Sequence, residues 1–292
     1  MKAVETINLS YTYPDGTLAL DNVNFAADKG ENVAILGPNG AGKSTLLHHF
    51  NGLALPTSGK VYIFGMEVAK ANLDTIRQKV GLVFQDPDDQ LFARTVRQDI
   101  AFGPTNIGLP PNEVTSRVKW AIDITELSGL EEKPPQNLSQ GQKKRAAIAG
   151  VLAMKPEIIV LDEPMANLDP RTASRILRLL LQLNRDYGLT VIIATHDVDL
   201  VPLFADKVYI LHRGRVFTEG RLDEVFMKTE TLRSIDLRLP RITHLFEILK
   251  RRDHLPINNP YPLTIGDARR ELIELLESEK NSRKTRDKER SA

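Results

Sequence analysis

The residues that could do chemistry in this sequence begin with a glycine-rich loop that ends in a lysine and two hydroxyls. The segment from Gly37 to Thr45 fits the pattern G-x-x-x-x-G-K-[ST]. In this pattern the backbone N–H groups point at phosphate oxygens, and the following helix N-terminus adds partial positive charge. Lys43 is placed to reach the β- and γ-phosphates, and the Ser44 hydroxyl is placed to bind Mg²⁺. The loop predicts a nucleoside triphosphate site made of Gly37, Pro38, Asn39, Gly40, Ala41, Gly42, Lys43, Ser44 and Thr45.

Apolar segments on both sides of this loop predict the elements that must position it. The run Val33–Leu36 predicts a buried strand leading into the loop, and Ser44–Leu47 opens a helix leading out of it. Later apolar runs also predict strands, and these end in Gln85, in Asp162 with Glu163, and in His196. Because ligands in open α/β sheets gather at the carboxyl ends of parallel strands, we expect these side chains beside the phosphate loop.

The residue types at these strand ends suit the hydrolysis of a bound nucleotide. Asp162 is suited to bind Mg²⁺ directly or through water, and Glu163 is suited to polarise the attacking water. Adjacent carboxylates repel each other in a low-dielectric site, and Mg²⁺ supplies the charge that relieves this repulsion. The amide oxygen of Gln85 suits Mg²⁺ or the water, and His196 can donate a hydrogen bond to the γ-phosphate. A solvated acidic turn and a purely structural histidine are the alternatives.

The composition narrows the classes of function further. The 292 residues suffice for one large or two modest domains, and a net charge of +1 gives no general field for nucleic acid or an anionic membrane. The absence of cysteine excludes disulfides, thiol nucleophiles and thiolate metal sites. No window approaches the roughly 18 consecutive apolar residues of a transmembrane helix. We therefore expect a chain that is soluble by itself, with any membrane role supplied through a partner.

A second helix start, at Leu138–Gln142, discriminates among the proteins that carry a phosphate loop. Its sequence is Leu-Ser-Gln-Gly-Gln, and Ser139 is placed as the N-cap of a helical stretch. With this segment the chain resembles the ATP-binding-cassette (ABC) ATPases, whose signature is usually Leu-Ser-Gly-Gly-Gln. The order of motifs is also that of the family over nearly all of residues 1–220. Gln140 departs from the pattern because it replaces the first glycine, which bears on the turnover rate, whereas Gly141 is kept.

The resemblance implies an α/β fold with a P-loop NTPase core, an N-terminal antiparallel β subdomain, a helical subdomain that carries the signature, and a C-terminal helical extension. The expected boundaries are 1–225 for the nucleotide-binding domain, about 93–155 for the helical subdomain within it, 226–278 for the extension and 279–292 for a flexible charged tail. In the helical subdomain we expect breaks at Pro104 and at Pro110–Pro111. ATP and Mg²⁺ are the implied cofactors. The implied magnesium ligands are Ser44, Gln85 and Asp162, and the implied catalytic residues are Lys43, Gln85, Glu163 and His196.

The resemblance further implies that a second chain completes the site. In ABC ATPases the signature of one subunit closes over the ATP held by the phosphate loop of the other. By this analogy the residues that act in trans are Ser139, Gly141, Gln142 and Asp169. Tyr13 aligns best with the aromatic residue that stacks on adenine, Tyr11 is the alternative, and either could be an ordinary strand aromatic. A homodimer is expected, and a heterodimer with a second ATPase stays open.

The segment Phe84–Phe92 narrows the choice among ABC ATPases. Its sequence, Phe-Gln-Asp-Pro-Asp-Asp-Gln-Leu-Phe, is similar to a run found in the energy-coupling-factor ATPases, which drive the uptake of cobalt, nickel and vitamins. An acidic, proline-broken loop that ends in two apolar residues suits the docking of a partner helix, and a solvated turn is the alternative. The resemblance implies the ATP-hydrolysing subunit of a cobalt or nickel importer. Such a subunit lies on the cytoplasmic face of the membrane, with a transmembrane coupling subunit and a substrate-binding membrane subunit as partners.

Other functions stay open at this point. A vitamin or another micronutrient is the alternative cargo. A soluble ABC protein of DNA repair or translation usually carries two cassettes or a long coiled-coil insertion, and the sequence has neither, so no nucleic-acid partner is expected. The chain could also be a non-hydrolysing regulatory subunit, but the presence of both Glu163 and His196 argues against this interpretation.

The sequence beyond Gly220 predicts helices without nucleotide motifs. The stretch after Pro240 has an amphipathic helical period, and Thr264–Asp267 predicts the cap of a further helix. This extension is similar to that of the coupling-factor ATPases, where it helps the dimer. From Glu279 onward the charges alternate and we expect a frayed tail, with a nucleic-acid arm or a contact with anionic lipid as the alternatives.

Overall fold

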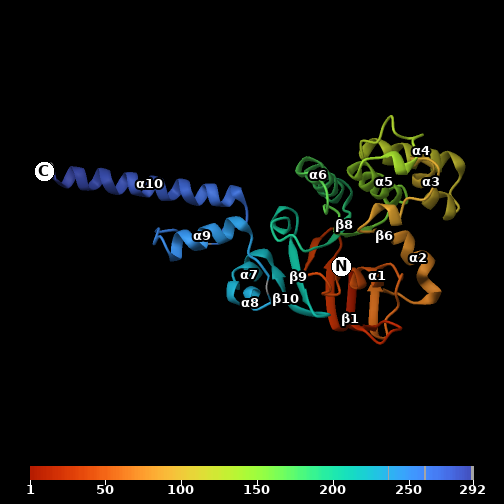
Figure 1. The fold of residues 1–292 in the computed structure, drawn as a ribbon, viewed down its shortest axis with the longest axis horizontal. Coiled ribbons are helices and arrows are strands. Elements are labelled where there is room, and N and C mark those ends of the chain that lie inside the picture. The colour runs from red at the N-terminus through yellow and green to blue at the C-terminus, as the bar shows by residue number, and fades with distance from the viewer. Residues whose placement is uncertain (236, 260, 291–292) are drawn as a thin grey trace. The chain divides into compact units, whose positions relative to one another are not determined.

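The computed structural model describes residues 1–290 except 236 and 260, with side chains through Ser278. The chain divides into two compact units (Figure 1). The first comprises Met1–His196 and Phe204–Glu219, and the second comprises Asp197–Leu203 and the chain from Gly220 onward. The second unit therefore begins a few residues before the expected boundary at 225, and it includes a short segment that precedes the last strands.

The N-terminal sheet of the first unit is antiparallel, with the strand order β2-β1-β4-β5. Its strands are β1 (Lys2–Thr12), β2 (Leu18–Asp28), β4 (Ser58–Ile63) and β5 (Met66–Glu67). Along β2 the residues Val23, Phe25 and Ala27 are buried, and the residues between them are not. This period of two is typical of a strand with one face on the core, so the sheet covers the core from one side.

The second sheet has the order β10-β9-β3-β8-β7-β6, and its pairs β9–β3, β3–β8, β8–β7 and β7–β6 are parallel. Its strands are β3 (Asn32–Leu36), β6 (Val80–Val83), β7 (Ile158–Asp162), β8 (Thr190–Thr195), β9 (Lys207–His212) and β10 (Arg215–Arg221). Every residue of β3, β6, β7 and β8 is buried. Burial on both faces accounts for the continuous apolar runs in the sequence. The carboxyl ends of these parallel strands lie at one edge of the sheet.

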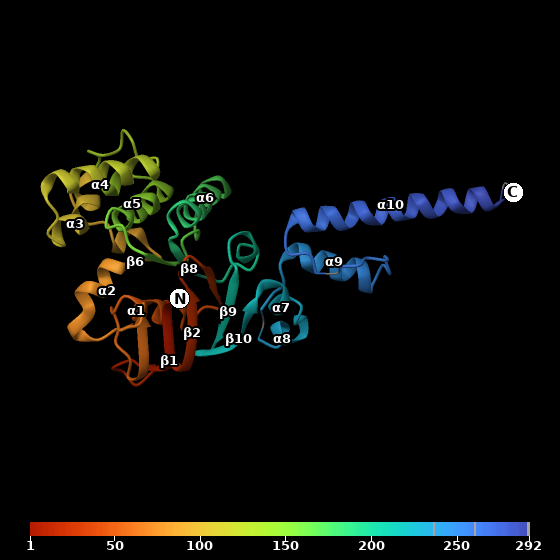
Figure 2. The same cartoon turned by 180° about the vertical axis from the view of Figure 1, so that it is seen from behind.

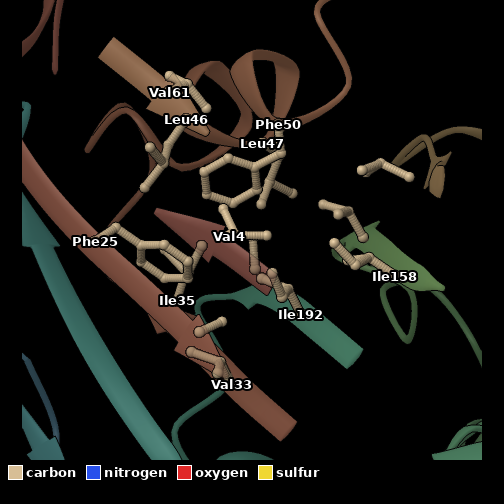
Figure 3. Close-up of a cluster of buried hydrophobic side chains, with 14 of the residues drawn as sticks. Val4, Phe25, Val33, Ile35, Leu46, Leu47, Phe50, Val61, Ile158 and Ile192 are labelled. Carbon is tan, nitrogen blue, oxygen red and sulfur yellow. The ribbon is translucent and has the colours of Figure 1, made fainter. Parts of the chain in front are cut away.

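Helix α1 (Lys43–Phe50) packs its apolar face into the core that the two sheets share (Figure 3). Leu46, Leu47 and Phe50 are fully buried there. They contribute to one cluster with Val4 of the antiparallel sheet and Ile192 of the parallel sheet. Burial of each such side chain is worth about 1.5–3 kcal/mol, so this packing fixes the start of α1, where the phosphate loop ends.

The other helices of the first unit are α2 (Leu73–Lys79), α3 (Val96–Asn106), α4 (Pro111–Ile124), α5 (Gln140–Leu152) and α6 (Pro170–Tyr187). Helices α3, α4 and α5 form a group with its own core, beyond the β6 edge of the sheet (Figures 1 and 2). Pro110 and Pro111 begin α4 as expected. The break expected at Pro104 is wrong, because α3 continues to Asn106. Pro104 lies near the end of the helix, where few backbone hydrogen bonds remain to be lost.

The α-helices in the described part of the second unit are α7 (Leu222–Phe226), α8 (Thr229–Arg233), α9 (Arg241–Arg251) and α10 (Ile265–Arg290). Phe246 of α9 and Ala268 of α10 belong to a small buried cluster that joins these two helices. Thr264 and Asp267 exchange side-chain and main-chain hydrogen bonds at the start of α10, as the sequence predicts. The backbone of α10 stays helical to Arg290, and not frayed from 279, since this stretch is rich in good helix formers and lacks glycine and proline. Residues 291 and 292 of the expected tail lie outside the described residues.

These elements confirm the predicted architecture: a parallel α/β core, an antiparallel N-terminal sheet, an inserted helical group and C-terminal helices. Within the described part of the chain, none of the helices combines the length and hydropathy that a membrane span requires.

Candidate functional site

A cleft of about 690 Å³ opens at the carboxyl ends of the parallel strands. It brings together the phosphate loop and the polar residues predicted at three strand ends. The residues that line it are Tyr13, Thr17, Leu18, Ala19, Asn39, Gly40, Ala41, Gly42, Lys43, Ser44, Thr45, Gln85, Asp162, Glu163, His196, Arg213 and Gly214. The convergence follows from the sheet order, because β6, β7, β8 and β3 are neighbours and run in the same direction.

The phosphate loop joins β3 to α1 through glycines that the fold requires. A Cβ at Gly37 would lie 2.3 Å from the main-chain oxygen of Leu211. Gly42 has a φ of +99°, and a Cβ there would lie 2.7 Å from the main-chain oxygen of Ala19. Side chains at these two positions would therefore push the loop away from the neighbouring strands.

Lys43 lies inside this loop and is only 6% exposed. Its Nζ donates hydrogen bonds to the carbonyls of Gly37 at 2.9 Å and Pro38 at 3.2 Å. Glu163 Oε1 lies 3.6 Å from the same Nζ. The loop thus surrounds an ammonium group that lines the cleft, which is the place that a phosphate-binding lysine must occupy.

Asp162 ends β7 beside the first turn of α1 and is 6% exposed. Its Oδ1 is buried and has no hydrogen-bond partner, and Ser44 lines the same cleft. Burial raises the pKa of Asp162 above its ordinary value, with a hydrogen bond from Ser44 opposing the rise and the charge of Glu163 adding to it. A carboxylate oxygen without a partner, beside a hydroxyl and the Gln85 amide, matches the oxygen ligands that Mg²⁺ takes. The residues present therefore fit a magnesium ion.

Glu163 is held in the cleft by its backbone conformation and by three neighbouring side chains. Its φ is +42°, a left-handed conformation that is strained for a residue with a side chain. Thr195 Oγ1 donates to Glu163 Oε2 at 3.2 Å, and His196 Nδ1 donates to Glu163 Oε1 at 2.8 Å. With Lys43 also nearby, the carboxylate is held in one orientation toward the cleft. A carboxylate held in this way at a phosphate loop is suited to act as a general base.

The aromatic residue that lines the cleft is Tyr13. Its hydroxyl is 2.8 Å from Thr45 Oγ1, which ties the ring to the start of α1. Tyr11 packs behind it, edge-on to Tyr13 at 5.0 Å between ring centroids and edge-on to the buried His49 at 4.8 Å. Of the two tyrosines, Tyr13 therefore lines the cleft, and Tyr11 packs against its ring.

The residues expected to act in trans lie outside this cleft. Ser139 caps α5 and forms a reciprocal capping box with Gln142, and Gly141 lies within the same turn. Asp169 caps α6, where it accepts hydrogen bonds from the backbone N–H groups of Arg171 and Thr172. The structure does not bring these residues to the chain's own phosphate loop.

Sequence reasoning missed several residues of this site. Thr195 ends β8 and bonds to Glu163, yet a threonine at the end of a strand carries no chemical signal of its own. Arg213 and Gly214 reach the cleft from the turn between β9 and β10, far along the chain. Only the sheet order, which places β9 next to β3, could have indicated them.

Comparison with known proteins identifies the family. The ABC transporter family model matches residues 20–166. The energy-coupling factor transporter ATP-binding protein EcfA of Methanocaldococcus jannaschii is 55% identical over 278 residues, which cover 94% of this chain and 99% of the relative. The solved structure of CbiO1 from Clostridium perfringens, described as part of the ABC transporter complex CbiONQ, is 46% identical with a TM-score of 0.73, and the match covers 85% of this chain and 99% of CbiO1.

A further structure shows the same fold in a dimer. The ATP-binding cassette MJ0796, in a dimeric post-hydrolysis state bound to ADP and Pi, is 33% identical with a TM-score of 0.69, over 75% of this chain and 98% of that cassette. The motifs, the fold and these similarities agree. The chain therefore belongs to the ABC transporter ATP-binding proteins, and among them to the energy-coupling-factor ATP-binding subunits.

Proposed function

We propose that this chain is the ATP-hydrolysing subunit of an energy-coupling-factor importer for cobalt or nickel ions. The observation that carries the hydrolytic part is the Glu163 carboxylate, held by Lys43, Thr195 and His196 beside the phosphate loop. The coupling-factor type is supported by the resemblance of Phe84–Phe92 to the energy-coupling-factor ATPases, and the metal cargo is supported by the similarity to CbiO1.

In the proposed reaction Glu163 accepts the proton of the water that attacks the γ-phosphate. General-base catalysis of this kind contributes about 10²–10⁴-fold to a rate. Lys43 and the N–H groups of the loop hold the β- and γ-phosphates, so that the reacting groups stay aligned. His196 orients the carboxylate through Nδ1 and faces the same cleft. When bound by Ser44, Gln85 and Asp162, Mg²⁺ would neutralise part of the phosphate charge.

The proposed active form is a dimer in which each chain completes the other's site. Ser139, Gly141, Gln142 and Asp169 lie outside the chain's own cleft, and this position supports a role at the nucleotide of a second chain. The dimeric state described for the ADP-bound cassette supports the same arrangement. Contacts made in trans to a transferring phosphoryl group are worth about 10³–10⁵-fold in other NTPases. A homodimer is the simplest form for one chain.

The proposed contact with the transmembrane coupling subunit is an apolar groove of about 300 Å³ beside the Phe84–Phe92 segment. Phe92 is 66% exposed at its rim, and its ring meets the exposed Phe102 edge-on at 4.7 Å. Met154 forms part of the opposite wall. An apolar groove with exposed aromatic rings suits the end of a partner helix. Through this groove the chain would lie on the cytoplasmic face of the membrane.

Uptake by the assembled transporter tests the proposal. The chain is co-expressed with candidate coupling and substrate-binding membrane subunits, and the purified complex is reconstituted in vesicles with ATP on the side of the ATPase. We expect ATP-dependent uptake of radiolabelled cobalt or nickel, which Glu163→Gln abolishes. ATP-dependent uptake of a vitamin without uptake of either metal would overturn the cargo. No uptake, with normal hydrolysis by the chain, would overturn the transport role.

A further inference from the structure

Lys144 is a buried lysine beside the Gln85 loop, and no step of the proposed reaction uses it. It lies on the second turn of α5, the helix that begins at the signature, and is only 2% exposed. Its Nζ donates hydrogen bonds to the main-chain carbonyls of Phe84 at 3.1 Å and Gln85 at 2.6 Å. The ammonium group therefore joins the signature helix to the backbone of the Gln85 loop.

Stability of the fold does not explain this lysine. Burial lowers the pKa of Lys144, and the charges of Asp86, Asp162 and Glu163 only partly oppose this effect. Removing an ammonium group from water is costly, and the lowered pKa shows that the surroundings of Lys144 offset this cost only in part. Here the ammonium group donates its hydrogen bonds to two main-chain carbonyls of a neighbouring loop. A lysine in this position is therefore better explained by what it positions.

Gln85 is the residue that it positions. The Gln85 side chain lines the nucleotide cleft, where it is proposed to meet Mg²⁺ or the attacking water. Its carbonyl, on the other side of the same residue, is bound to Lys144. Lys144 in turn lies roughly 7 Å along α5 from Ser139, because a helix rises about 1.5 Å per residue. The side chain of Gln85 thus faces the nucleotide cleft, and its carbonyl is tied to α5, the helix that presents the signature.

Two neighbouring contacts strengthen the connection. Gln90 accepts a hydrogen bond from Phe84 N at 3.1 Å and donates one to the carbonyl of Ala147 in α5 at 3.1 Å. Lys143 pairs with Asp88 at 2.6 Å, but this pair lies closer to solvent, since Asp88 is half exposed. Among the contacts made by Lys144, Gln90 and Lys143, only that of Lys144 ends on Gln85 itself.

We propose that Lys144 is a positioning residue that couples the Gln85 loop to the signature helix. A displacement of Gln85 at the nucleotide is passed through the Lys144 contact to α5, and with α5 to Ser139 and Gly141. The inference rests on the proposed hydrolytic function, and it adds to it the residue through which one nucleotide site controls the signature offered to the other.

Trp120 provides a direct readout of this coupling. It is the single tryptophan of the sequence and lies on α4, which shares a core with α5. Its ring meets Tyr187 of α6 edge-on, with 6.1 Å between ring centroids. A shift of the helical group against α6 would change the surroundings of the indole, and so its fluorescence. The measurement needs neither hydrolysis nor membrane subunits.

The test compares Lys144→Met with Lys143→Met, which removes the same charge one residue away. In both, and in the parent, we measure ATP affinity by equilibrium dialysis, kcat and KM for hydrolysis, melting temperature, and the change of Trp120 emission on adding Mg-ATP. The binding and fluorescence measurements are made in a Glu163→Gln background, in which ATP persists. They therefore report on the coupling even where the parent chain alone does not hydrolyse ATP.

We expect Lys144→Met to keep its ATP affinity and to melt a few degrees lower, because the carbonyls of Phe84 and Gln85 lose their donor. It should also lose the Trp120 response and about ten- to a hundredfold in kcat, with KM little changed. Lys143→Met should stay within about twofold of the parent in every measurement. A normal Trp120 response and kcat in Lys144→Met would overturn the proposal. A much lower melting temperature together with a weaker ATP affinity would assign Lys144 a structural role instead. A parent chain whose Trp120 emission ignores ATP would overturn the coupling itself.

Discussion

Replacing Asp162 by asparagine is expected to stabilise the nucleotide-free protein while abolishing its magnesium-dependent hydrolysis. The carboxylate is 6% exposed, its Oδ1 has no hydrogen-bond partner, and a second carboxylate follows it in the chain. Asparagine has nearly the same shape and carries no charge. The variant therefore removes a desolvated charge without leaving a cavity.

The size of this effect follows from the cost of a buried polar group without a partner, about 1–3 kcal/mol. The variant also loses the attraction between Asp162 and Lys43, and this loss is subtracted from the gain. We therefore expect the free energy of unfolding to rise by about 1–2 kcal/mol. For a domain of this size 1 kcal/mol corresponds to roughly 2–4 °C in melting temperature. Thermal unfolding in EDTA at pH 7 measures the gain, and adding Mg-ATP should stabilise the parent more than the variant.

The pH dependence of the gain has a definite sign. Burial raises the pKa of Asp162 in the folded state above its ordinary value of 3.8, so the folded protein binds this proton more tightly than the unfolded chain does. Stability of the parent therefore falls as pH rises from 3.8 through the raised pKa, and the full cost is present above it. The advantage of the variant should be complete at high pH and should disappear as the pH falls toward 3.8.

A matched control is Asp74→Asn, which removes an exposed carboxylate from α2 and should change stability by less than about 0.5 kcal/mol. A variant Asp162→Asn that is less stable than the parent in EDTA at pH 7 would refute the reasoning. So would a gain that persists unchanged at low pH.

Four further substitutions test three separate parts of the account. Tyr13→Ala should weaken ATP binding by about tenfold, as expected for the loss of one stacked base, whereas Tyr11→Ala should lower stability more than affinity; isothermal titration and thermal unfolding distinguish the two. Gly141→Ala should reduce hydrolysis by more than about tenfold and lower stability by about 1–3 kcal/mol, because its Cβ would lie 2.6 Å from Thr172 Cγ2. Steady-state kinetics measures the hydrolysis, and an unchanged rate would contradict this prediction. Phe92→Asp should abolish co-purification with the coupling subunit and leave hydrolysis by the chain alone intact, and a stable complex would argue against the groove.

The sequence predicted the chemistry at the strand ends better than it predicted the contacts behind it. The phosphate loop has a fixed spacing of residues, and buried parallel strands give continuous apolar runs. Both patterns can therefore be recognised in the amino-acid sequence. The bond from Thr195 to Glu163 and the burial of Lys144 depend on which strands become neighbours, and no local pattern carries that information. Pro104 predicted a helix end because proline usually breaks helices, but its effect depends on how many turns follow it.

The C-terminal segment illustrates the same limit. Its alternating charges suggested a frayed tail, since nothing there can build a core. The backbone of α10 nevertheless stays helical to Arg290, because propensity alone favours a helix in a stretch without glycine or proline. Composition alone therefore did not predict the local conformation of this segment.

Hydrolysis by the purified chain and by its Glu163→Gln variant tests the central claim most directly. We expect the parent to hydrolyse ATP cooperatively and only with Mg²⁺, and the variant to lose about 10²–10⁴-fold in kcat while keeping ATP affinity. Sedimentation of the variant with ATP should show a persistent dimer. A variant that hydrolyses ATP at the rate of the parent, or that binds ATP and remains a monomer, would contradict the account.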